Sequence, residues 1–131
     1  MSGMAFDQTG VSPSAKVLVV EDDHQLRRVV TMVIERAGLS VLAVANADDA
    51  IVVLAGNDPV SVLFTDVDMP GSMNGIDLAH RVSCNHPTIR VIVASGRSSV
   101  DVAELPAGAE FFRKPYDIHC LTRALYGTAQ V

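Results

Sequence analysis

The stretch VSVLFTD, from Val60 to Asp66, is a short apolar run that ends in an acidic residue. A run of this length and composition predicts a buried strand over residues 60–65. A carboxylate at the end of a buried strand is costly to desolvate, so it normally has an ionic partner or a chemical task. Asp66 is therefore the first candidate functional residue.

Three further apolar runs also lead into polar residues with reactive side chains. Residues 17–20 (VLVV) lead into Glu21-Asp22-Asp23, residues 89–94 (IRVIVA) lead into Ser95, and residues 110–113 (EFFR) lead into Lys114-Pro115. If these runs and the run before Asp66 are parallel strands, their ends share one edge of a sheet.

The segments between the runs have the periodicity of helices. Helices are predicted at about residues 26–37, 47–54, 76–85 and from 117, a further strand at 40–45, and only a short helix between residues 95 and 110. Asp22 or Asp23 is a candidate cap for the first helix, and Asn46 for the second. Alternating strands and helices predict an α/β fold, with helices on both faces of a parallel sheet and the functional site beyond the carboxyl ends of its strands.

Length and composition indicate one domain with an aliphatic core. The chain has 131 residues, of which 49% are hydrophobic and only 5% aromatic, with no Trp. Residues 1–14 are polar and show no period, so they are expected to be a flexible lead-in, followed by a single domain over residues 15–131.

The charge and the apolar segments exclude several classes of function. A net charge of −5, with basic residues spread along the chain, argues against direct nucleic-acid binding. No stretch approaches the roughly 20 apolar residues needed to cross a bilayer, and the first fifteen residues lack the apolar centre of a signal peptide. Cys84 and Cys120 form no pair typical of a zinc site. The protein is therefore expected to be cytoplasmic, with no membrane association.

The residues at the strand ends suggest phosphate chemistry. Glu21, Asp22 and Asp66 would repel one another unless a cation lies among them, and Mg²⁺ or another divalent ion with oxygen ligands fits that need. Asp22 and Asp66 could bind the ion directly and Glu21 through water. A carboxylate can also accept a phosphoryl group, whose charge Lys114 and Ser95 could then neutralise.

Each of these residues also has an ordinary structural interpretation. An aspartate after a strand is commonly a cap or turn former, and Glu21-Asp22-Asp23 could be the acidic first turn of a helix. Lys114 could be a solvated lysine and Ser95-Gly96 a simple turn. The joint occurrence of the set at four strand ends, in this order, favours the functional interpretation.

Four motifs together closely resemble the receiver domain of two-component response regulators, over about residues 16–127. The motifs are VLVVEDD with Glu21 to Asp23, LFTDVDMP with Asp66 to Pro70 followed by Asn74-Gly75, VASG with Ser95, and FFRKP with Phe111 to Pro115. The resemblance implies a flavodoxin-like, doubly wound sheet of five parallel strands in the order 2-1-3-4-5, with five helices.

The resemblance also implies roles for individual residues. Asp66 is the expected phosphoacceptor, Glu21 and Asp22 the acidic pair, and Asp68 the donor of a backbone carbonyl to the metal. Ser95 matches the switch hydroxyl, Lys114 the family's lysine and Phe111 the switch aromatic, and the peptide bond between Lys114 and Pro115 is expected to be cis.

The chain departs from the common pattern at three places. The loop from Pro70 to Gly75 is one residue longer than the commonest version. The stretch from Ser95 to Lys114 is about three residues short, so the fourth helix should be stunted, and dimerisation through that face is doubtful. Phe111 has no hydroxyl, so an aromatic switch would work by packing. Such short connections are similar to those of receivers that stand alone or follow histidine kinases.

The expected function is a phosphoacceptor signalling domain. The expected partners are a histidine kinase or histidine phosphotransfer protein and a downstream protein target. Arg97 is a candidate partner for Asp68, and the pair would slow hydrolysis. Two alternatives stay open. The D-x-D motif of Asp66 and Asp68 also fits a haloacid-dehalogenase-type phosphatase, although Pro70 and the early acidic pair do not. The chain could also be an unphosphorylated receiver-fold binding module.

Overall fold

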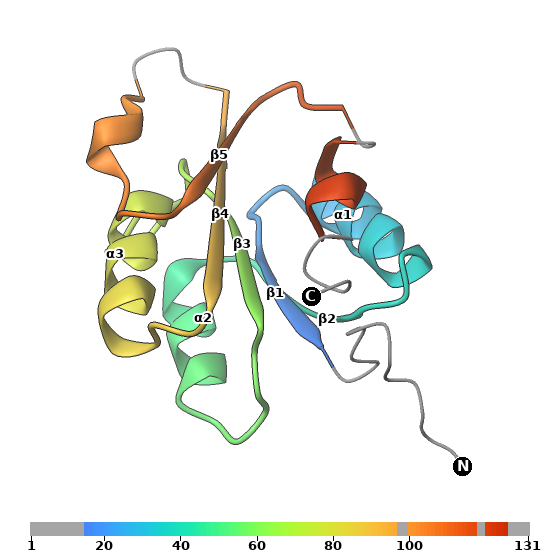
Figure 1. Cartoon of the computed structure of the whole chain (residues 1–131), viewed down its shortest axis with the longest axis horizontal. Helices are drawn as coiled ribbons and strands as arrows, with labels where there is room; N and C mark the ends of the chain where they lie inside the picture. Colours follow the sequence, from blue (N-terminus) through green and yellow to red (C-terminus); the bar gives the residue numbers. More distant parts are fainter. Residues whose placement is uncertain (1–14, 97–99, 118–119, 126–131) are drawn as a thin grey trace.

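The computed structural model describes residues 15–96, 100–117 and 120–125, which form one parallel sheet covered by helices on both faces (Figure 1). The strand order is β2-β1-β3-β4-β5, as the resemblance implied. The strands are β1 (Lys16–Val20), β2 (Ser40–Val44), β3 (Val62–Asp66), β4 (Arg90–Ser95) and β5 (Glu110–Arg113). The α-helices are α1 (His24–Arg36), α2 (Ala47–Leu54) and α3 (Gly75–Asn85), and residues 120–125 are also helical.

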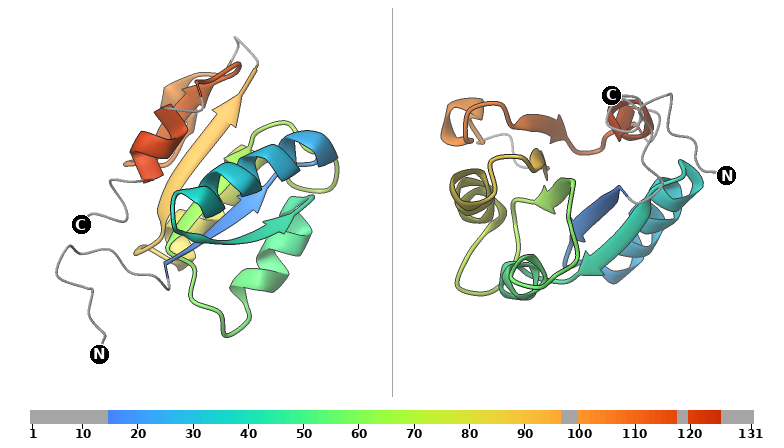
Figure 2. Two further views of the ribbon diagram at one scale, coloured as in Figure 1. Left: turned by 90° about the vertical axis from the view of Figure 1, so that its right-hand side faces the viewer. Right: turned by 60° about the horizontal axis from the view of Figure 1, so that its bottom comes forward.

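The sheet separates two apolar cores, because the central strands are buried on both faces. On one side, Val30 and Ile34 of α1 and Leu121 and Leu125 of the C-terminal helix pack on the sheet. On the other side, α2 and α3 contribute Ala50, Leu78, Val82 and their neighbours. Figures 1 and 2 show the sheet between these two helical layers. The core is mostly aliphatic, in line with the composition.

Side-chain caps determine where the helices begin. Asp23, rather than Asp22, caps α1, because its Oδ1 accepts hydrogen bonds from the backbone N–H groups of Gln25 and Leu26. Asn46 caps α2 as predicted. Asn74 and Asp77 form a reciprocal capping box at the start of α3. The side chain of Asp22 is thereby left for the functional edge of the sheet.

Two predicted strands are displaced along the chain. The third was predicted at residues 60–65, but β3 begins at Val62 and ends at Asp66 itself, and β4 extends to Ser95 instead of ending at Ala94. Apolar patterning was a poor guide here, because Asp66 continues the ladder opposite Ala94 although its side chain is acidic. Asp66 and Ser95 are therefore the last residues of their strands and are held by the sheet.

The predicted fourth helix is a single 3₁₀ turn, η2 (Val102–Glu104), so the expected number of five helices was one too high for the described residues. The segment after β4 must bury Val100 and Leu105 in the core and then turn at Gly108, which has φ +84°. This leaves too few residues for an α-helix between the two buried side chains. The shortening itself was predicted, but the type of helix was not.

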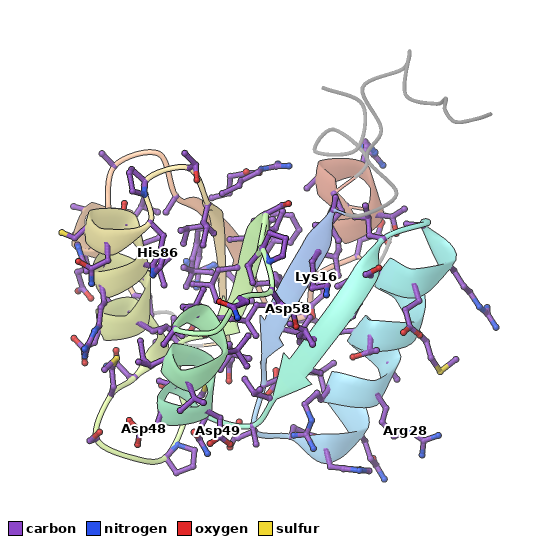
Figure 3. The ribbon with its side chains drawn as sticks, turned by 90° about the horizontal axis from the view of Figure 1, so that it is seen from below. Lys16, Arg28, Asp48, Asp49, Asp58 and His86 are labelled. Atoms are coloured by element: carbon purple, nitrogen blue, oxygen red, sulfur yellow. The ribbon has the colours of Figure 1, made fainter. Side chains whose placement is uncertain are left out.

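The opposite edge of the sheet, at the amino ends of the strands, carries an ion pair between Lys16 Nζ and Asp58 Oδ1 at 3.7 Å (Figure 3). The predicted lead-in, residues 1–14, lies outside the described residues. None of the helices in the described part of the chain has the length and apolar character needed to cross a bilayer.

Candidate functional site

Four neighbouring strands deliver the candidate residues to one place. Glu21 directly follows β1, Asp66 ends β3, Ser95 ends β4, and Lys114 directly follows β5. Because β1, β3, β4 and β5 lie side by side in the sheet, their carboxyl ends are adjacent.

Lys114 joins two of the acids directly. Its Nζ lies 3.1 Å from Asp66 Oδ1 and 3.2 Å from Glu21 Oε1. The two carboxylates are only 7% and 6% exposed, so the ammonium compensates charges that water hardly reaches. The backbone N–H of Lys114 donates to the Ser95 carbonyl at 2.8 Å, and the Lys114–Pro115 bond is cis, which confirms that expectation.

Three carboxylates form what we call the acidic cluster: Glu21, Asp22 and Asp66. Each offers one oxygen, and these oxygens all lie within 4.8 Å of one another. Asp22 is exposed, whereas the other two are buried, so the cluster opens to solvent on one side. Oxygen donors at this spacing, with an open side for water, fit a Mg²⁺ ion that keeps part of its hydration shell.

The charged forms of the buried carboxylates in the acidic cluster are disfavoured when no cation is bound. Burial raises the pKa of Asp66 above its ordinary value, Lys114 opposes that shift, and Asp68 and Asp22 add to it. Burial likewise raises the pKa of Glu21, against a hydrogen bond from the Asp23 N–H. Burial alone would lower the pKa of Lys114, but the adjacent Asp66 and Glu21 outweigh it and raise that pKa. The site thus holds more negative charge than one ammonium can neutralise.

The other predicted residues that the structure describes are Ser95, Asp68 and Phe111. Ser95 is fully buried at the end of β4. Asp68 is exposed, two residues after Asp66. Phe111 is half-buried and packs against the core on the α2 and α3 side, and the Arg113 guanidinium lies 5.5 Å from the centre of its ring. Arg97, the candidate partner of Asp68, lies outside the described residues.

Sequence reasoning did not assign a role in shaping the site to three residues that have one. Arg27 donates from Nη1 to the Glu21 carbonyl at 2.8 Å. Gly75 brings the start of α3 so close to β3 that a Cβ there would lie 1.9 Å from the Asp66 carbonyl oxygen. Tyr116 lines, with four other residues, a hollow of about 490 Å³ beside Lys114. Only Gly75 carried a usable signal, because Asn-Gly at a helix start indicates a close backbone approach.

The comparisons with known proteins agree with this geometry. Residues 17–126 match the family model described as the response regulator receiver domain, which covers most of the chain. The chain belongs to this family. The receiver domain is a signalling domain, and the haloacid-dehalogenase alternative finds no support.

Two curated relatives of this receiver domain differ greatly in length. It is 34% identical over 105 residues to the DNA-binding transcriptional regulator NtrC of Salmonella typhimurium, which corresponds to 78% of this chain and 22% of that protein. It is 30% identical over 113 residues to the response regulator receiver protein CpdR of Brucella abortus, covering 84% of this chain and 92% of that protein. The chain therefore spans about a fifth of the first relative and nearly all of the second.

Solved structures confirm the receiver fold. A response regulator receiver domain protein from Clostridium thermocellum is 25% identical and superimposes with a TM-score of 0.79, covering 88% of this chain and 94% of that one. TrrA from Thermotoga maritima, solved in complex with Mg²⁺-BeF, is 18% identical with a TM-score of 0.73, covering 87% of this chain and 98% of that one. At that identity the second likeness concerns the fold alone.

Proposed function

We propose that this receiver domain accepts a phosphoryl group on Asp66 from a phosphohistidine of a histidine kinase or histidine phosphotransfer protein. A carboxylate oxygen of Asp66 attacks phosphorus, the new P–O bond forms as the P–N bond breaks, and the imidazole leaves with the electron pair of that bond. The observation that carries the proposal is the buried Asp66 carboxylate with the Lys114 ammonium 3.1 Å away, inside a cluster of three acids.

The surrounding residues have the groups that such a transfer requires. Lys114 neutralises charge on one phosphoryl oxygen, and the Ser95 hydroxyl donates to another once it turns toward the product. Glu21, Asp22, Asp66 and the backbone carbonyl of Asp68 would hold Mg²⁺ or another divalent cation, which when bound supplies positive charge beside the phosphoryl oxygens. The Mg²⁺-BeF complex of TrrA, a protein of the same fold, supports this arrangement.

The domain signals by changing the conformation of the surface that a downstream protein binds. Phosphorylated Asp66 carries roughly −1.5 to −2 charges in place of the single negative charge of the free carboxylate, and it favours a state in which Ser95 and Phe111 have moved toward the site. Phe111 works by packing, since its ring contacts the core and the Arg113 guanidinium. A downstream protein reads the altered surface in the cytoplasm, without direct contact to nucleic acid or membrane. The only reactions that the domain catalyses are its own phosphorylation and dephosphorylation.

Labelling with acetyl phosphate tests the proposal. The wild-type protein with Mg²⁺ should gain one phosphoryl group, measured by intact mass and by phosphate-affinity electrophoresis, and EDTA should prevent it. Asp66→Ala should abolish the labelling. Asp58→Ala is the matched control, because Asp58 is an exposed aspartate at the opposite edge of the sheet, and it should label like the wild type (Figure 3).

Two results would contradict this assignment. Full labelling of Asp66→Ala would show that another residue is the acceptor. Failure of the wild type to label, together with failure to bind beryllofluoride in the presence of Mg²⁺, would instead favour an unphosphorylated binding module.

A further inference from the structure

Arg27, in the first turn of α1, reaches back to the turn that carries two of the clustered acids. Its Nη1 donates a 2.8 Å hydrogen bond to the backbone carbonyl oxygen of Glu21, and its side chain is half-buried. That carbonyl belongs to the planar peptide unit between Glu21 and Asp22. The hydrogen bond therefore fixes the orientation of this peptide plane.

The orientation of the plane matters because Asp22 is exposed. Packing does little to direct an exposed side chain, so the backbone at residues 21 and 22 determines where the Asp22 carboxylate points. The rest of the turn is already held: the Glu21 N–H donates to the Val44 carbonyl at 3.1 Å, and the Asp23 N–H donates to Glu21 Oε2 at 3.1 Å. The Arg27 hydrogen bond fixes a further group of this turn, the Glu21 carbonyl.

We propose that Arg27 is a positioning residue of the acidic cluster. By holding the peptide plane between Glu21 and Asp22, it keeps the Asp22 carboxylate close enough to Glu21 and Asp66 for the three to bind one divalent cation. A guanidinium suits this task because its planar fork is preorganised and stays charged at all relevant pH values. The inference rests on the proposed function, in which the acidic cluster binds Mg²⁺.

The charge of Arg27 acts in the opposite direction to its hydrogen bond. A cationic side chain near the cluster repels Mg²⁺, so loss of the charge alone would tighten metal binding. Loss of the hydrogen bond would weaken binding, because the carboxylates are then less well arranged. The sign of the change in Mg²⁺ affinity therefore distinguishes the two effects.

The test compares Arg27→Met and Arg27→Gln with Arg28→Met in the full chain. Met has no donor, and the Gln amide ends two bonds short of the position of Nη1. Arg28 is the neighbouring arginine on the outer side of α1 and is exposed, so its replacement removes the same charge without touching the turn (Figure 3). Mg²⁺ dissociation constants are measured by calorimetry, with circular dichroism in EDTA to verify folding.

Both Arg27 variants should bind Mg²⁺ at least about tenfold more weakly than Arg28→Met, the range typical for loss of an outer partner of a metal site. Their labelling by acetyl phosphate should be slow at limiting Mg²⁺ and approach the control at saturating Mg²⁺. Unchanged or tighter Mg²⁺ binding would overturn the inference, and so would labelling that stays slow at saturating Mg²⁺. The binding measurement requires no phosphorylation, so its failure is distinct from failure of the labelling of Asp66.

Discussion

Asp66 carries a charge that its surroundings only partly compensate. The side chain is 7% exposed, Lys114 is shared with Glu21, and Asp22 and Asp68 add negative charge nearby. Its pKa in the folded state is therefore raised by burial. The residue suited to accept a phosphoryl group is, in the metal-free protein, a source of instability.

Asp66→Asn should therefore stabilise the metal-free protein at neutral pH. The folded pKa lies above the unfolded one, so the stability linked to this carboxyl is present below the unfolded pKa and is lost as pH rises through the folded value. The neutral amide avoids that loss. In EDTA at pH 7, thermal unfolding followed by circular dichroism should show a higher Tm for Asp66→Asn. Addition of Mg²⁺ should raise the Tm of the wild type more than that of the variant. A lower Tm for the variant in EDTA would contradict this account.

Tyr116 is the second residue with a perturbed pKa beside the site. Burial of the ring, which contacts Phe64 and Phe112 edge-on, raises the pKa of its phenol to about 12, and Lys114 opposes the shift. The chain has two tyrosines, and the other is Tyr126, outside the described residues. The two phenols can therefore be separated by substitution.

Absorbance titration of the phenolate in EDTA should show a late transition near pH 12 that Tyr116→Phe removes. Because the folded pKa of Tyr116 exceeds the ordinary phenol value of 10.0, stability linked to this group is lost as pH rises between these two values. The urea midpoint of the wild type should therefore fall more steeply in that window than the midpoint of Tyr116→Phe. A single transition near pH 10 in the wild type would count against a buried phenol.

At the scale of elements, α3 begins in close backbone contact with β3. A Cβ on Gly75 would lie 1.9 Å from the Asp66 carbonyl oxygen and 2.8 Å from Val67 Cα, and both are backbone atoms that cannot rotate away. The Gly75 N–H also donates to the Val67 carbonyl at 2.9 Å. The helix therefore fixes the backbone that carries Asp66.

Gly75→Ala should destabilise the fold by about 1–3 kcal/mol or more, since the added methyl forces the helix and strand apart. It should also slow the labelling of Asp66 in the protein that remains folded. Gly56→Ala is the control, because its nearest atom, the Val53 carbonyl oxygen, lies at 3.3 Å and requires a small adjustment. Urea unfolding of both variants gives the comparison, and equal midpoints would disprove the close approach.

The elements differ in how well the sequence predicted them. Strand β5 has its predicted bounds, and Asn46 caps α2 as predicted, because apolar runs and caps act locally. The end of β3 was misplaced, since the ladder to Ala94 includes an acid that local pattern assigns to a loop. The turn η2 was not predicted as 3₁₀, because its form depends on how Val100 and Leu105 reach the core.

The sequence predicted those residues of the site that lie at the carboxyl ends of strands. Glu21, Asp66 and Lys114 come together because parallel strands align their carboxyl ends. Arg27 and Tyr116 could not be found in that way. An arginine on a polar helix face and a tyrosine after proline have many possible contacts, and only the packing of α1 and the C-terminal segment selects among them.

At the scale of the molecule, Arg90 ties the last elements to the sheet. Its Nη2 donates to Glu110 Oε1 at 2.9 Å, and its Nη1 donates to the Ala124 carbonyl at 2.6 Å. It thereby links β4, β5 and the C-terminal helix. The Arg90 and Glu110 side chains are 30% and 37% exposed, so solvent screening weakens their ion pair. Arg90 nevertheless contacts both β5 and the C-terminal helix.

Arg90→Met should loosen the C-terminal helix before the rest of the fold. Hydrogen exchange at residues 120–125 should accelerate, while exchange in α1 should change little, and global stability should fall by about 1–2 kcal/mol, given the solvent exposure of the contact. Arg81→Met, which removes an exposed arginine from α3, should leave exchange at residues 120–125 as in the wild type. Equal exchange in the two variants would argue against the contact.

The sequence separation of Lys114 from its partners has a consequence for biosynthesis. Lys114 neutralises a glutamate that precedes it by 93 positions, so a ribosome makes both buried acids long before it makes their counter-charge. In a nascent chain that contains only β1 to β4, burial of Glu21 and Asp66 would therefore not be stabilised by the Lys114 ammonium. Burial of Glu21 and Asp66 beside a counter-charge has to wait until β5 and Lys114 emerge from the exit tunnel.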